Sequence, residues 1–155
     1  MNNSYKLVKD INQFDLNCVF FCEPTKNNIM EDGTFIRIMY SNSIFTLNGI
    51  YLLLNVNYNS VDKYYNKLKC VFDVEQYKYL INKICLIENA ILDKIESVGK
   101  VKQLKLNDQF KNGCLKVFSE TNQTNNYGDK IILKISGIWE TDNEYGLTYK
   151  LIFGN

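Results

Sequence analysis

Cationic and aromatic side chains gather on two neighbouring segments near the end of the chain. Residues 130–139 and 147–153 both alternate apolar with polar residues, and a short polar stretch separates them. This pattern is typical of a β-hairpin, which we expect over residues 130–153. The hairpin carries the single tryptophan of the chain among residues suited to stacking or to charge: Lys134, Trp139, Tyr145 and Lys150. Rings and cations on one rigid element suit a binding surface that uses stacking and charge better than they suit an active site.

Side-chain alternation predicts how the two strands of this hairpin pair. Trp139 would lie opposite Leu147 and Leu133 opposite Phe153, which places the apolar residues on one common face. Trp139 and Tyr145 would then either stack on bases or close the end of the core. The opposite face, which is either a phosphate-binding surface or simply a solvated sheet face, carries Lys134, Ser136, Thr148 and Lys150.

Three further residues are candidates for the same surface. Arg37 lies between two isoleucines of an expected strand, so it faces away from them and can bind phosphate, pair with a carboxylate or point to water. Lys116 alternates with apolar neighbours in the same way. Tyr51 follows Asn48–Gly49 and is either a stacking platform or a core residue. The complete set of expected nucleic-acid-binding residues is Arg37, Tyr51, Lys116, Lys134, Trp139, Tyr145 and Lys150.

Several classes of active site are excluded by residues that the chain lacks. There is no histidine, which removes histidine-based acid–base and nucleophile systems and histidine-ligated metals. Cys18 and Cys22 have no second pair at the spacing of a zinc site, and no glycine-rich phosphate loop occurs. Asp142 and Glu144 fall in the expected hairpin turn, where acidic residues favour turn formation. We expect no enzyme, no metal and no cofactor, although a nuclease with oxygen ligands alone stays formally open.

Size and charge indicate one domain, residues 1–155, that is not strongly basic. The chain is 46% hydrophobic and 14% aromatic, which is enough for a core. Its net charge is +1, whereas dedicated nucleic-acid binders are usually more basic, so binding requires lysines segregated on one face. Five scattered cysteines, with no signal peptide and no membrane-spanning run, favour a reducing intracellular compartment and no membrane contact.

Turn-forming residues divide the chain into strands, one helix and connections. Residues 1–15 are expected to form an arm or a short edge element. Asn48–Gly49 interrupts the apolar residues 44–56, either as a hairpin turn or as a bulge in one long strand. Residues 100–111 are expected to be a connection and residues 120–129 a polar loop. The other expected strands are residues 16–22, 34–40, 64–72 and 114–118.

Residues 74–98 have the pattern of an amphipathic helix. Apolar residues recur there at three- and four-residue steps and form a single stripe, which indicates packing on a sheet. Asp73 can cap its start and Gly99 can end it, while polar residues such as Glu88 would cover its remaining surface. One such helix in an otherwise antiparallel β chain predicts a mainly β fold. We expect an OB-like antiparallel barrel or a strongly curved sheet with the helix inserted between strands.

Two segments resemble the single-stranded-DNA-binding proteins of large DNA viruses and phages. Residues 132–150 look like the C-terminal hairpin of those proteins, and residues 43–54 have a similar pattern. The family is built on the OB-fold, so the resemblance implies single-stranded DNA binding during replication, in the nucleus or cytoplasm of a host. The chain departs from the family in its near-neutral charge and in the lack of the acidic tail with which many members recruit replication proteins.

These observations lead to two functional expectations. The first is a non-catalytic module that binds single-stranded nucleic acid, DNA according to the resemblance, with replication proteins as further partners. The second is a protein-interaction or viral assembly module without nucleic-acid binding, because near-neutral charge and abundant tyrosine suit a protein interface. A homo-oligomer is compatible with both.

Overall fold

The computed structural model describes residues 8–27, 29, 33–118 and 130–154. The expected loop over residues 120–129 and residues 1–7 of the expected arm lie outside them. The longer elements are β4 (Thr34–Ser41), β6 (Ile50–Asn55), β7 (Tyr58–Tyr64), β8 (Lys67–Phe72), α1 (Lys78–Asp93), α2 (Lys105–Lys111), β10 (Cys114–Phe118), β11 (Lys130–Glu140) and β12 (Glu144–Phe153). The shorter strands are β1 (Lys9–Asp10), β2 (Val19–Phe21), β3 (Thr25–Lys26), β5 (Thr46–Leu47) and β9 (Val101–Gln103), and η2 (Ile11–Gln13) and η3 (Leu16–Cys18) are 3-10 helices.

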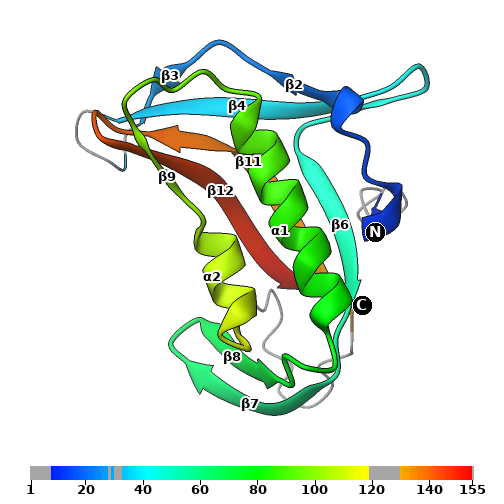
Figure 1. The fold of residues 1–155 in the computed structure, drawn as a ribbon. Coiled ribbons are helices and arrows are strands. Elements are labelled where there is room, and N and C mark those ends of the chain that lie inside the picture. The colour runs from blue at the N-terminus through cyan, green and yellow to red at the C-terminus, as the bar shows by residue number, and fades with distance from the viewer. Residues whose placement is uncertain (1–7, 28, 30–32, 119–129, 155) are drawn as a thin grey trace.

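One mixed sheet runs through the described chain, with both α-helices on one side of it (Figure 1). Its strands lie in the order β1–β6–β11–β12–β10–β8–β7; β4 also pairs with β11, β2, β3 and β5 pair with β4, and β9 pairs with β12. The expectation of a mainly β fold is confirmed. The expected OB-like closure is not found, because the path ends at β1 and β7, which do not pair with each other. The sheet also contains parallel pairs, β1 with β6 and both β9 and β10 with β12.

The expected C-terminal hairpin forms from β11 and β12, but its register differs from the expected one. Leu133 lies opposite Leu151 rather than Phe153, and Trp139 lies opposite Gly146. The expected and observed partners differ by two residues at Leu133 but by one residue at Trp139. A single shift of one strand along the other therefore does not explain the difference.

A β-bulge in β11 explains the changing offset. The register shifts between Ile135 and Gly137, so Ser136 is an extra residue on this strand. Because an inserted residue reverses the alternation beyond it, Leu133 before the bulge and Trp139 after it point to opposite faces. We call the face covered by α1 and α2 the inner face and the opposite one the outer face. Trp139 therefore lies on the outer face and not, as expected, on the face of Leu133.

Glycines in the hairpin let two rings lie directly on the outer face. A Cβ atom on Gly137 would be 2.6 Å from ring atoms of Phe35 and closer still to the carbonyl oxygen of Ile36. A Cβ atom on Gly146 would be 2.9 Å from Cζ2 of Trp139. The bare glycine backbone thus provides the room for both rings, a pairing that stabilises glycine positions in sheets.

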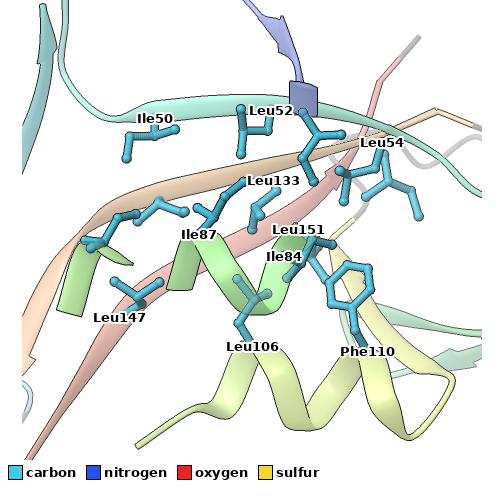
Figure 2. Close-up of a cluster of buried hydrophobic side chains, with 14 of the residues drawn as sticks. Ile50, Leu52, Leu54, Ile84, Ile87, Leu106, Phe110, Leu133, Leu147 and Leu151 are labelled. Carbon is cyan, nitrogen blue, oxygen red and sulfur yellow. The ribbon is translucent and has the colours of Figure 1, made fainter. Parts of the chain in front are cut away.

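The inner face holds the hydrophobic core. Figure 2 shows side chains of α1 and α2 directed toward those of β6, β11 and β12. Each such side chain contributes roughly 1.5–3 kcal/mol on burial. The buried residues labelled there are Ile50, Leu52, Leu54, Ile84, Ile87, Leu106, Phe110, Leu133, Leu147 and Leu151.

The expected helix is confirmed but is shorter than residues 74–98. α1 begins at Lys78 and ends at Asp93. Asp73 does not cap α1, because its Oδ1 accepts the backbone N–H of Glu75 at 3.0 Å and so forms a turn ahead of the helix.

A second helix, α2, occupies part of the expected connection and depends on a buried carboxylate of α1. The side chain of Glu88 is fully buried and accepts the backbone N–H groups of Leu106 at 3.1 Å and Asn107 at 2.9 Å. These are N–H groups of the first turn of α2, which have no partner within the helix. The expectation of a surface Glu88 is therefore wrong. Burial raises the pKa of Glu88, and nearby Asp108 adds to the rise, while the two hydrogen bonds oppose it.

Three expected features of the first half are corrected by the structure. The strand over residues 16–22 is reduced to β2, because residues 16–18 form the 3-10 helix η3. Asn48–Gly49 is neither a hairpin turn nor a bulge, since β5 and β6 on its two sides pair with β4 and β11 respectively, and Gly49 has a φ of 132°. Residues 64–72 are only part of the hairpin of β7 and β8, whose turn contains Tyr65 with a φ of 54°.

Gly137→Ala tests the close approach of β4 to β11. The added methyl group must displace the Phe35 ring and the backbone of Ile36, so we expect the free energy of unfolding to fall by about 1–3 kcal/mol. Urea denaturation measures this change. The matched variant Ser136→Ala should change it by no more than about 0.5 kcal/mol. Equal stabilities of the two variants would contradict the tight packing at Gly137.

Glu88→Gln tests the buried carboxylate. Because the pKa of Glu88 is raised in the folded protein, the protonated form favours folding, and its stabilising effect is lost as the pH rises through the raised pKa. The amide of the variant stays neutral, so the free energy of unfolding of the variant should increase relative to the wild type as the pH rises above the ordinary glutamate pKa of about 4.3. The exposed Glu75→Gln serves as the control. A pH-independent difference for Glu88→Gln would contradict the prediction.

Candidate nucleic-acid interface

Strand alternation places cations and aromatic rings together on the outer face. Tyr51 lies between two buried residues of β6, so it points away from the core, and it is opposite Lys134 of β11. Phe35 and Arg37 of β4 lie opposite Trp139 and Gly137 of β11 beyond the bulge. The outer face therefore carries residues from three strands, β4, β6 and β11.

A row of lysines crosses this face from strand to strand. Lys134 of β11 lies opposite Lys150 of β12, and Lys116 of β10 lies opposite Lys69 of β8. The parallel register of β10 and β12 sets Lys116 level with Lys150, which joins the two pairs. Neighbouring strands are about 4.8 Å apart, so like charges are adjacent, an arrangement that destabilises a sheet. We call these four residues the lysine row.

Cations of the outer face also lie over its rings. Such contacts contribute roughly 0.5–1 kcal/mol at exposed sites. They hold the charged groups close to the sheet, so a flat, anionic ligand bound there could contact a ring and a cation at the same time. The distances to the ring centroid are 4.6 Å for Lys150 Nζ and 4.8 Å for Lys67 Nζ at Phe118, 5.2 Å for Lys105 Nζ at Trp139, 5.6 Å for Lys134 Nζ at Tyr51 and 5.6 Å for Arg37 Cζ at Phe35.

Carboxylates do not pair with these cations within the described chain. Arg37 donates a hydrogen bond to Oδ1 of Asn48 at 3.0 Å, and Asp62 of β7 lies opposite Lys69 at the end of the lysine row. The ion pairs that the described residues form lie elsewhere: Lys78–Glu75, Lys100–Glu140 and Lys102–Asp93. A nearly neutral chain can thus present a positively charged face.

The structure brings most of the expected site residues together and separates one from them. On the outer face lie Arg37, Tyr51, Lys116, Lys134, Trp139 and Lys150. Trp139 is only 8% exposed, with its ring against Gly146 and beneath the ammonium group of Lys105, so little of this ring is available for stacking. Tyr145 is only 7% exposed and belongs to the inner core, so its ring is not available for stacking.

Sequence reasoning missed five residues of this surface: Phe35, Lys67, Lys69, Lys105 and Phe118. Phe118 alternates with Lys116 along β10, and Lys67 alternates with Lys69 along β8, so each pair shares a face. That alternation is readable in the sequence. The same spacing places Phe35 on the face of Arg37 along β4. Lys105 could not be found in this way, because its place depends on where α2 begins.

The described residues contain no group of three or more cysteine, aspartate or glutamate residues that could hold a metal ion. Burial raises the pKa of Cys70 to about 12, so its thiol stays protonated near neutral pH. The Sγ of Cys85 donates a hydrogen bond to Oδ1 of Asn107 at 2.6 Å, and burial also raises its pKa.

Comparison of the chain with protein-family models, with curated proteins and with solved structures finds no match. Neither described α-helix has the length and apolar character needed to cross a membrane.

Lys116→Gln tests the repulsion within the lysine row. Lys116 has a lysine on each side, so we expect the variant to be more stable by about 0.2–1 kcal/mol at low salt. The gain should shrink as added salt screens the charges. Lys26→Gln, on the short strand β3, is the control and should show no such salt dependence. A destabilised Lys116→Gln protein would contradict the prediction.

Proposed function

We propose that the protein binds single-stranded nucleic acid on the outer face and does not catalyse a reaction. The lysine row is the observation that supports this proposal most strongly. Four adjacent like charges cost folding free energy, and no ion pair within the described chain offsets that cost. A ligand with regularly spaced negative charges removes the repulsion, and a polynucleotide backbone has that property.

The rings beside the row favour a polynucleotide over other polyanions. Bases stack on aromatic side chains with little dependence on sequence, and the positive groove follows the backbone. Tyr51 and Phe118 are both half-buried, so neither residue is fully enclosed in the core. DNA in replication or genome handling is the ligand that the resemblance to viral and phage proteins implies, and we include it in the proposal. An OB-like closure is not needed, because the charged and aromatic residues share one open sheet face.

Binding of a fluorescein-labelled oligothymidine, followed by anisotropy over a range of salt concentrations, tests the proposal. The wild type should bind at low salt and lose affinity steeply as salt rises. The double variant Lys116→Gln/Lys150→Gln should bind more weakly, and its slope of log affinity against log salt should be smaller by roughly 1.4.

A matched double variant separates the outer face from total charge. Lys26→Gln/Lys83→Gln removes the same charge from β3 and from α1, where Lys83 lies over Tyr79, and should bind as the wild type does. No binding by the wild type at low salt would overturn the proposed function. Light scattering that shows a tight oligomer unchanged by DNA would instead favour a protein-interaction module.

A further inference from the structure

The aromatic ring of Phe118 lies close to the ammonium groups of two lysines. The ammonium groups of Lys67 and Lys150 are both within 5 Å of its centroid, at 4.8 Å and 4.6 Å. Lys67 lies opposite Phe118 on β8, and Lys150 lies on β12 two residues before Ile152, which pairs with Phe118. Two like charges at one ring repel each other, so an anion placed between them would be attracted by both.

Apolar side chains continue from Phe118 across the neighbouring strands. Phe118 pairs with Ile152, Ile152 lies opposite Ile132, and Ile132 lies opposite Leu53. Ile132 is buried, whereas the other three are half-buried. We call these four residues the apolar row. It runs parallel to the lysine row, two residues or roughly 7 Å further along each strand.

The lysine row suits the phosphates of an unpaired polynucleotide, and the apolar row suits its bases. We propose that Phe118 is a base-stacking residue, and that a single strand crosses the β-strands with its phosphates along the lysine row and its bases toward the apolar row. This inference rests on the proposed function and adds a path and a stacking residue to it. Phosphates would lie between Lys150 and Lys116, where cations from adjacent strands converge.

The arrangement selects single strands over duplexes. In a duplex the base faces are stacked on one another, so a ring fixed to a flat sheet cannot reach them. A single strand exposes each base face, and Phe118 lies at the border between the charged and the apolar row. The duplex could still contact the lysine row through its phosphates, which would give weaker binding without stacking.

Tryptophan substitutions measure stacking directly. Phe118→Trp places a fluorophore at the proposed stacking position, and Tyr79→Trp places one on α1, on the other side of the sheet, at a ring that is 64% exposed. Trp139 is present in both variants, so the comparison isolates the added indole. Oligothymidine should quench the fluorescence of Phe118→Trp and not that of Tyr79→Trp, and a duplex of the same length should quench neither.

Affinity measurements complete the test. Phe118→Leu should bind oligothymidine about 5- to 150-fold more weakly than the wild type, while Phe118→Tyr and Tyr79→Leu should bind as the wild type does. If the wild type binds but Phe118→Leu is unchanged or Phe118→Trp is not quenched, the inference is wrong and the proposed function stands. If Phe118→Leu does not fold, the quenching of Phe118→Trp decides. If the wild type does not bind, the proposed function itself fails.

Discussion

One extra residue in β11 determines what the outer face presents. The bulge at Ser136 lies where β11 changes partner, from β6 before it to β4 beyond it. Without the reversal of alternation at this point, Trp139 would point into the core and Ile138, which is fully buried, would point out. The bulge therefore lets a single strand contribute Lys134 to the lysine row and still keep an apolar inner face along its whole length.

The inner face of the sheet stabilises the fold, whereas the charges on the outer face destabilise it. On the inner face, α1 and α2 cover the core, and Glu88 fixes the start of α2 through two backbone N–H groups. A second contact ties α2 to the hairpin, because Gln109 donates to the hydroxyl of Tyr149 at 2.6 Å and accepts the backbone N–H of Lys116 at 2.7 Å. The outer face instead carries repelling charges. Surfaces that cost stability in this way are common where a protein binds a ligand.

The sequence predicted features that depend on short-range patterns and missed those that depend on tertiary pairing. Alternation was enough to find the terminal hairpin and to place Lys134 and Lys150 on one face. It failed for Trp139, because the alternation was continued without a break through Gly137, although a glycine inside a strand can mark a bulge. The helical stripe identified α1, but Glu88 lies on the polar side of that stripe and is buried only because α2 packs there. Tyr145 has both an aromatic ring and a hydroxyl group, so its residue type does not predict which face it occupies. The register of β12 against β11 places it in the core.

The open end of the sheet also has a consequence for how copies of the chain meet. Within the described chain β7 pairs with β8 alone, so its other edge offers backbone groups to any extended strand. Lys63 on β7 lies opposite the buried Leu68, and Asp62 is its exposed neighbour. A strand added at this edge would have to strip water from both charged groups. Charged side chains on an edge strand disfavour edge-to-edge pairing of sheets, so Asp62 and Lys63 oppose such contacts between copies of the chain.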